Sequence, residues 1–293
     1  MQTIYFEKAQ NISTAKRGSL ILTGGFTKIA PSLSANLFSK ILMRPFGRRK
    51  YEFKRLEPQS TKLSMSMGEI QVYYFEGQKV DNSKCMKVLL SHGWMDNSRR
   101  FETMIAELTA QGHSVWSLDH IGHGKSAGNM SHLFGFKEGF ETVIQHIEQL
   151  AGPLDAFIAH SMGCVALMNL NPELLANKKK IMLSVPFDVF ESMYSSVHGA
   201  GISKSVLTNL LEHVSKRYSY NWKNFEPKDK KEMIDDGFLF IHDRNDSVAS
   251  FTVAESLVQS SEASFVATEN LGHLGVFKDQ TVIQHVSDFL KSA

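Results

Sequence analysis

The chain has few cysteines and no long apolar segment, and each lack excludes a class of protein. Cys85 and Cys164 are the only cysteines in 293 residues and lie far apart, which fits a reduced cytosolic protein better than a cross-linked secreted one. The stretch from Met1 to Glu7 has no basic region of the kind that opens a signal peptide, and no apolar run approaches the ~20 residues of a membrane span. We therefore expect a cytoplasmic, soluble protein of one large α/β domain or two smaller ones.

Charge is distributed unevenly along the chain. The formal net charge is +2, yet residues 1–60 hold eleven Lys or Arg against three acidic residues, which leaves the remainder at −6. Residues 1–50 form a basic amphipathic N-terminal segment. Apolar side chains fall there at helical spacing: Leu33, Leu37, Phe38, Ile41 and Leu42. Basic residues follow them: Arg44, Arg48, Arg49, Lys50, Lys54 and Arg55.

Two interpretations of this segment stay open. In the one we favour, a helix packs its apolar face on the domain and keeps its charges in water. In the other, the helix lies on a membrane surface with a basic collar. We expect at most weak binding to anionic vesicles. Aromatic residues are sparse among the basic ones and no zinc-finger or RNA-binding motif is present, so a nucleic-acid partner is not expected.

From about residue 51, short apolar runs rich in β-formers alternate with helical patterns, which is typical of a parallel sheet with crossover helices. Strands are expected at 69–75, 86–91, 113–118, 154–159, 181–185, 237–242 and 263–267. Helices are expected at 99–111, 137–150, 251–260 and 282–290, and directly after Ser161.

Residues 187–233 break this alternation, because two or three helical patterns follow one another there without a strand. The interval is also rich in aromatic residues. We interpret it as a helical cap inserted into a core made of residues 51–186 and 234–293. Most of its aromatic side chains are expected to pack the cap on the body, and a minority to line an apolar substrate pocket.

The pentapeptide Ala159-His160-Ser161-Met162-Gly163 lies where an apolar run meets a helical pattern of small residues. On such a strand-to-helix turn only small neighbours are tolerated, and a serine hydroxyl projects out of the fold beside the first helical N–H groups. Alanine stands at the first position, where the usual pattern has glycine. Taken alone, the pentapeptide fits an ordinary turn as well as a nucleophile elbow.

A serine nucleophile needs a histidine as base and a carboxylate to orient that histidine. Asp246 lies in the loop after the expected strand at 237–242, and His273 lies in a glycine-flanked loop after the last strand. Asp243 and Asp188 also follow strand ends and are alternatives for the acid. We favour Asp246, which precedes Val248 as is usual in such motifs.

In the order Ser161, Asp246, His273, with each residue just past a strand, the chain from about residue 69 onward resembles the α/β-hydrolase superfamily. This resemblance implies the α/β-hydrolase fold, a mostly parallel eight-stranded sheet with helices on both faces and a helical cap after strand 6. Ser91-His92-Gly93-Trp94 is similar to the family's His-Gly-x loop. By resemblance, the oxyanion hole consists of the backbone N–H groups of Trp94 and Met162.

Several other residues have both a chemical and a structural interpretation. The run from Asp119 to Ser126 is similar to a family turn that shapes one wall of the site. Within it, His120 and His123 have a spacing compatible with metal binding, but no H-E-x-x-H motif accompanies them, and we interpret them as loop histidines. His160 is expected to pack or hydrogen-bond, and Cys164 cannot replace Ser161. No metal or organic cofactor is implied.

The sequence therefore predicts an enzyme, a serine hydrolase that cleaves a carboxylic ester through an acyl-enzyme intermediate, with Ser161 as nucleophile, His273 as base and Asp246 as its orienting acid. The substrate is expected to be a small ester, with an apolar acyl group as one possibility. Thioester hydrolysis, carbon–carbon bond hydrolysis and acyl transfer use the same three residues and stay open. A ligand-binding protein that kept only the fold is the alternative from another class.

Overall fold

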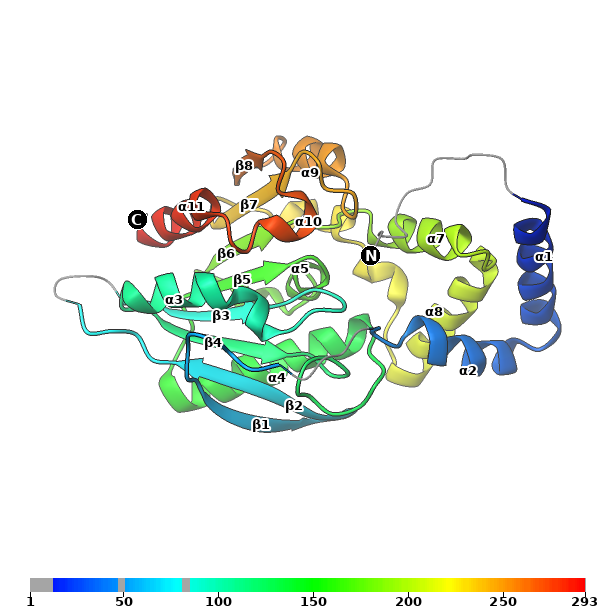
Figure 1. The fold of residues 1–293 in the computed structure, drawn as a ribbon, viewed down its shortest axis with the longest axis horizontal. Coiled ribbons are helices and arrows are strands. Elements are labelled where there is room, and N and C mark those ends of the chain that lie inside the picture. Colours follow the sequence, from blue (N-terminus) through cyan, green and yellow to red (C-terminus); the bar gives the residue numbers. More distant parts are fainter. Residues whose placement is uncertain (1–12, 47–50, 81–84, 293) are drawn as a thin grey trace.

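A single eight-stranded sheet organises the chain (Figure 1). The computed structural model describes residues 13–46, 51–80 and 85–292. The strand order is β1-β2-β4-β3-β5-β6-β7-β8; β2 runs antiparallel to both β1 and β4, and the other neighbours are parallel. The strands are β1 (Gln59–Met65), β2 (Gly68–Phe75), β3 (Lys87–Ser91), β4 (Ser114–Asp119), β5 (Ala156–His160), β6 (Lys179–Leu183), β7 (Phe238–Asp243) and β8 (Ser264–Thr268). This architecture confirms the predicted α/β-hydrolase fold.

The helices of the core lie on both faces of the sheet (Figure 1). They are η1 (Ser98–Phe101), α3 (Glu102–Ala110), α4 (Leu133–Ala151), α5 (Met162–Leu167), α6 (Pro172–Leu175), α9 (Phe251–Val258), α10 (Gly272–Gly275) and α11 (Gln280–Lys291). Each expected core helix is present, although α4 begins one turn before the predicted residue 137. The helix after Ser161 is shorter than its pattern indicates and ends at Leu167.

The core divides into two layers because successive side chains of a strand point to opposite faces. In β3, Leu89 packs with α4, α5 and α9, while Val88 and Leu90 pack with α3 and α11. Phe238 and Phe240 of β7 belong to the first of these layers. The central strands are apolar on both faces, so their runs are continuous rather than alternating. Each fully buried Leu or Phe contributes roughly 1.5–3 kcal/mol.

Two differences from the predicted strands have local causes. Strand β1 was not predicted; it is an edge strand whose sequence, from Gln59 to Met65, is mostly polar and exposed. Strand β6 ends at Leu183, two residues before the predicted end. Ser184 has a φ of +52°, which ends the strand in a tight turn.

Between β6 and β7 lie α7 (Val189–Gly199), α8 (Lys204–Tyr218), η2 (Trp222–Phe225) and η3 (Pro227–Met233). An apolar cluster joins them to the starts of α4 and α5 and includes Phe190, Leu210, Phe225 and Val165. Phe190 and Phe225 are buried, as expected for aromatic side chains that pack the insert on the body. The described residues of this interval therefore form a helical layer over the elbow region.

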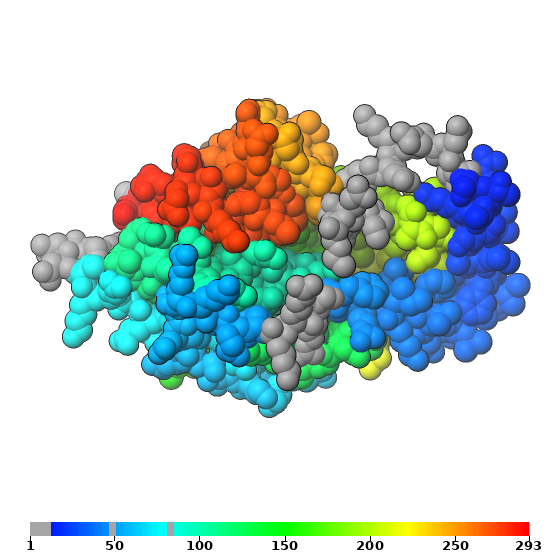
Figure 2. Space-filling model, viewed as in Figure 1, coloured from blue at the N-terminus to red at the C-terminus, as the bar shows by residue number. Residues whose placement is uncertain are grey.

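Two N-terminal helices, α1 (Thr14–Ile29) and α2 (Pro31–Leu42), lie at one end of the molecule against α8 (Figures 1 and 2). Helix α2 corresponds to the predicted amphipathic helix. The expectation that it buries its apolar face is wrong for most of that face: Phe38 is buried, whereas Leu33, Leu37 and Ile41 are exposed. The contact with α8 uses the adjacent face instead. No helix in the described ranges is long and apolar enough to cross a bilayer.

Candidate active site

Ser161 lies on a sharp turn between β5 and α5. Its φ is +51°, in the left-handed region that a non-glycine residue enters only at a cost. The backbone N–H of Ser161 donates to the Leu183 carbonyl at 3.0 Å, which fixes the turn to the neighbouring strand. Gly163 comes so close to β3 that a Cβ there would lie 2.6 Å from the Ser91 carbonyl oxygen. Ala159 is fully buried, so its methyl group is accommodated within the core.

His273 contacts Ser161 through one ring nitrogen and Asp246 through the other. The Ser161 hydroxyl donates to Nε2 at 3.0 Å, and Nδ1–H donates to Oδ2 of Asp246 at 2.8 Å. The three residues follow β5, β7 and β8, whose carboxyl ends share one edge of the sheet. The structure thus brings together the three side chains that the sequence analysis chose as nucleophile, base and acid.

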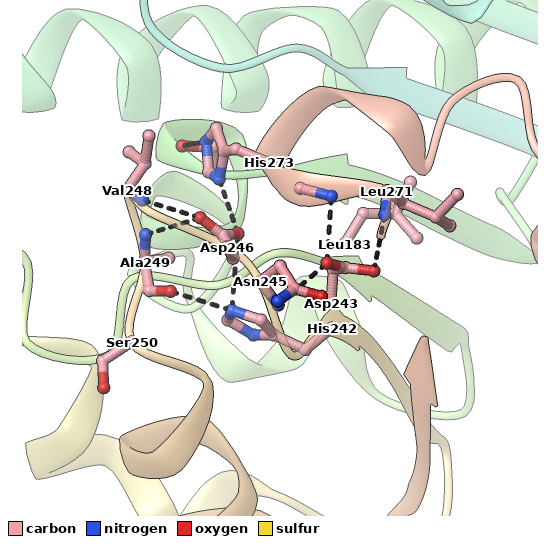
Figure 3. A network of polar contacts seen from close by, with 12 residues as sticks. Leu183, His242, Asp243, Asn245, Asp246, Val248, Ala249, Ser250, Leu271 and His273 are labelled. Carbon is pink, nitrogen blue, oxygen red and sulfur yellow. Dashed lines mark hydrogen bonds and ion pairs between the residues drawn. The ribbon is translucent and has the colours of Figure 1, made fainter. Parts of the chain in front are cut away.

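Both oxygens of the Asp246 carboxylate have partners (Figure 3). Oδ1 accepts from the N–H groups of Val248 at 2.8 Å and Ala249 at 2.9 Å. Oδ2 faces His273 and also Nε2 of His242 at 3.5 Å. Burial alone would raise the pKa of Asp246, but the hydrogen bonds from His242, His273 and Ala249 hold it well below its usual range. This carboxylate is therefore ionised beside the His273 ring at neutral pH.

Asp243, the first alternative for the acid, hydrogen-bonds to the loop that precedes His273. One oxygen accepts from the Leu271 N–H at 3.0 Å (Figure 3). The carboxylate also accepts from the Gly272 N–H at 2.9 Å and from Thr268 Oγ1 at 2.8 Å. Burial acts to raise the pKa of Asp243, and these bonds keep it below its usual range. The carboxylate holds the loop that leads into His273 and makes no bond to the ring.

Asp188, the second alternative, is not the hydrogen-bond partner of His273, whose Nδ1 bonds Asp246. It stands at the N-terminus of α7, and its Oδ1 has no hydrogen-bond partner among the described residues. Burial raises its pKa. The geometry thus favours Asp246 over both alternatives as the partner of His273.

His160, next to the serine in sequence, holds the backbone of His273 rather than the serine side chain. Its Nε2–H donates to the His273 carbonyl at 3.0 Å, and its ring lies 4.4 Å from that of Phe277. Burial, and then the proximity of His273, lower the pKa of His160 well below its ordinary value, so the ring is neutral. A packing or hydrogen-bonding role is what the sequence predicts for His160, and the fold identifies the partner as the His273 carbonyl.

The loop after β3 approaches the elbow very closely. A Cβ on Gly93 would lie 2.9 Å from both Ser161 Cβ and His160 Nδ1. Met162 begins α5, and its backbone N–H lies among the unpaired amides at a helix start. The Trp94 and Met162 amides donate no hydrogen bond in the described turns and loops. A loop amide and the amides of a helix N-terminus are both hydrogen-bond donors of the kind that stabilises an oxyanion.

The turn from Asp119 to Ser126 is a buried hydrogen-bonded support. The Asp119 carboxylate accepts from the Ser98 N–H at 2.8 Å and from the hydroxyl of Tyr51, whose role the sequence gave no motif to find. His120 Nε2 bonds Ser91 Oγ at 2.8 Å and its ring stacks on Phe136.

His120 and His123 both pack against neighbouring rings. The ring of His123 lies 5.2 Å from that of His92 and also contacts Phe136. In the part of the chain that the structure describes, no three His, Cys, Asp or Glu residues are grouped so as to hold a metal ion. Burial raises the pKa of the Cys164 thiol, which keeps it protonated beside the elbow.

Comparison with known proteins places these features in context. Residues 82–236 match the sequence model of a family described as serine aminopeptidase, S33. An 80-residue stretch is 37% identical to a monoacylglycerol lipase of Mycolicibacterium smegmatis, and one of the same length is 31% identical to a monoglyceride lipase homolog of Monkeypox virus. Each match covers 26% of this chain and 29% of the relative, so the chain spans less than a third of either relative's length.

Solved structures share the fold at low sequence identity. The esterase Pf2001 of Pyrococcus furiosus superposes with a TM-score of 0.60 at 14% identity, over 85% of this chain and 97% of that one. XC6422 of Xanthomonas campestris, described as an α/β serine hydrolase without a lid, gives 0.55 at 14% identity, over 83% and 100%. These two similarities support the fold. At 14% identity they do not identify the reaction, which has to be argued from the geometry of the site.

Proposed function

Because the chain belongs to the family described as serine aminopeptidase, S33, among the α/β hydrolases, we propose that it is a serine hydrolase that cleaves a carboxylic ester. The observation that carries the proposal is the hydrogen-bonded series Ser161, His273, Asp246. Its distances of 3.0 and 2.8 Å lie within the reach that proton transfer requires.

In the proposed reaction, Ser161 Oγ attacks the ester carbonyl carbon while His273 Nε2 takes the hydroxyl proton. The C–O bond to the alcohol then breaks, and His273 returns the proton to the leaving oxygen. Water, deprotonated by the same nitrogen, attacks the acyl-enzyme, and the acid leaves as Ser161 recovers its proton. Asp246 keeps Nδ1 protonated throughout and stabilises the cation that forms on the ring.

The negative charge of each tetrahedral intermediate needs donors that are in place beforehand. We assign this role to the backbone N–H groups of Trp94 and Met162. Each donor of this kind contributes on the order of 3 kcal/mol to the transition state. The close approach of Gly93 to Ser161 supports the assignment, since it holds the loop beside the serine.

For the substrate we propose an ester with an apolar acyl group. Met95 and Leu274, which follow Trp94 and His273 in the chain, are both about half exposed. Apolar side chains placed beside a site favour an apolar ligand portion. The partial relatives described as monoacylglycerol and monoglyceride lipases point in the same direction.

The test is Ser161→Ala with Ser260→Ala as the matched control, because Ser260 is an exposed serine in the turn after α9. Ser161→Ala should abolish both turnover of p-nitrophenyl esters and labelling by a fluorophosphonate, and Ser260→Ala should retain both. Retention of either property by Ser161→Ala would reject the assignment. A series of esters of increasing acyl length, run beside acyl-CoA thioesters, then tests the substrate class: a short-chain optimum contradicts an apolar acyl group, and preference for acyl-CoA indicates a thioesterase.

A further inference from the structure

Helix α1 is amphipathic, but its polar side faces the body of the protein and its large apolar side chains face solvent. Its small polar side chains face the body: Ser19 Oγ donates to the Gly201 carbonyl at 2.8 Å, and Thr23 Oγ1 accepts from the Ser203 N–H at 3.0 Å. A Cβ on Gly24 would lie 3.1 Å from Ser203 Oγ, so the backbone of α1 lies close to the Ser203 side chain. A surface helix of a globular protein usually turns its apolar side to the core.

The large apolar side chains of the two N-terminal helices point outward. On α1, Ile21, Leu22 and Ile29 are 74–86% exposed. On α2, Leu33, Leu37 and Ile41 are spaced four residues apart and are 41–64% exposed. Ser34, Ala35 and Phe38 of the same helix are buried. These six exposed residues, called the outer face below, exceed the scattered single apolar residues that are normal on a protein surface.

The charged residues of the two N-terminal helices and their flanks are all of one sign. Residues 13–46 contain five Lys or Arg and no Asp or Glu. They are Lys16, Arg17, Lys28, Lys40 and Arg44. Exposed apolar side chains beside cations are the composition by which a helix lies in the interface of an anionic bilayer. A second copy of this surface would bring like charges together, which argues against self-association.

The two helices are also fixed to the body. Thr27 Oγ1 and Ser34 Oγ hydrogen-bond at 2.8 Å between α1 and α2, and Asn209 of α8 donates to the Pro31 carbonyl at 2.8 Å. Leu42 and Met43 at the end of α2 pack on the apolar cluster that also contacts Met162. The outer face is therefore presented by a supported pair of helices, joined through the helical layer to the elbow region.

We propose that the outer face docks this protein on the surface of an anionic lipid bilayer, with its apolar side chains inserted among the acyl chains and its cations at the headgroups. This inference replaces the expectation of at most weak vesicle binding, because that expectation assumed a buried apolar face. It does not depend on the proposed hydrolase activity. If both hold, the active site works next to the bilayer.

The test is flotation of the full chain with vesicles of phosphatidylcholine alone or mixed with phosphatidylglycerol. We expect mixed vesicles to bind at least about tenfold more tightly, and added salt to weaken the binding without abolishing it. The variant with Leu22→Ser, Leu33→Ser and Leu37→Ser together should bind at least about tenfold more weakly. Leu150→Ser, which changes an equally exposed leucine on α4, should bind like the wild type.

Circular dichroism of the triple variant should match that of the wild type, because the three side chains are exposed. Ser161→Ala should bind vesicles like the wild type, so that a failure of the hydrolase proposal is distinguishable from a failure of this one. Wild-type binding by the triple variant, or equal binding to both kinds of vesicle at every salt concentration, overturns the proposal. A concentration-dependent dimer that the triple variant abolishes, with no binding to vesicles, also overturns it and assigns the outer face to a second copy.

Discussion

Replacing Gly93 by alanine perturbs the proposed site by a displacement that can be worked out from the structure. The new Cβ would lie 2.9 Å from Ser161 Cβ and 2.9 Å from His160 Nδ1. Ordinary van der Waals contact begins at 3.4 Å, so the loop and the elbow must separate by about 0.5 Å. The backbone of Gly93 does not lie in the left-handed region, so the clash alone is tested.

The separation moves the Trp94 amide away from Ser161. The proposed reaction needs these two groups at a fixed spacing. A misplacement of 1 Å costs about a hundredfold in rate, so half of it should lower kcat about tenfold, or about 1.4 kcal/mol in the barrier. Overpacking should also lower the free energy of unfolding by about 1–3 kcal/mol. KM should change less than kcat, since the substrate's remote contacts are untouched.

The assay is steady-state turnover of a soluble p-nitrophenyl ester together with urea unfolding. Gly25→Ala is the matched control, because a Cβ on Gly25 in α1 meets nothing within 4 Å. It should keep kcat and gain roughly 0.5–1 kcal/mol of stability, as alanine is the better helix former. A Gly93→Ala variant that is folded and has wild-type kcat would show that the spacing of loop and elbow does not set the rate.

Two further predictions concern buried carboxylates. Asp243→Asn should lower the free energy of unfolding by about 3 kcal/mol near neutral pH, because charge-assisted bonds to Leu271, Gly272 and Thr268 are weakened. The folded-state pKa of Asp243 is lowered, so its stabilisation of the fold is present above the unfolded-state pKa and lost as the pH falls through the folded-state pKa. Urea titrations at acid pH should show that the difference in unfolding free energy between variant and wild type shrinks. A constant difference contradicts the linkage. Burial raises the pKa of Glu226 from 4.5 to about 7. The contribution of this group to the free energy of unfolding is therefore fully present below pH 4.5 and lost as the pH rises through 7. Glu226→Gln should therefore stabilise the protein by up to about 3 kcal/mol near pH 8 and have little effect near pH 4, and equal effects at both pH values would rule out a buried charge as the cause.

The central sheet and the three site residues could be predicted from sequence for a geometric reason. Each of Ser161, Asp246 and His273 follows an apolar run that predicts a strand. Because the carboxyl ends of parallel strands share one edge of the sheet, these positions in the chain are enough to predict that the three residues lie close together. Strand β1 escaped prediction because an exposed edge strand has no apolar face to produce a pattern. Helix α1 escaped because Gly24, Gly25 and several small polar residues interrupt its apolar periodicity.

Other features needed three-dimensional contacts. Asp243 ends β7 and Asp246 follows three residues later. Only the positions of the Leu271 and Gly272 amides reveal that the first carboxylate holds the chain and the second bonds the His273 ring. Similarly, the spacing of Leu33 and Leu37 predicts that α2 has an apolar face but not which way it points. The direction follows from tertiary packing through Ala35 and Phe38, which helical periodicity does not encode.

The two oxygens of Asp246 have a consequence for how the charge on His273 can change. Oδ1 is held by the amides of Val248 and Ala249, so the carboxylate cannot rotate about its own axis when the ring gains a proton. Its dipolar surroundings are already arranged for an anion opposite a cation, and the His160 bond to the His273 carbonyl keeps the ring's backbone still. In the proposed reaction, little reorganisation energy would then be needed for each proton transfer, because the surrounding groups are already ordered when the chain folds.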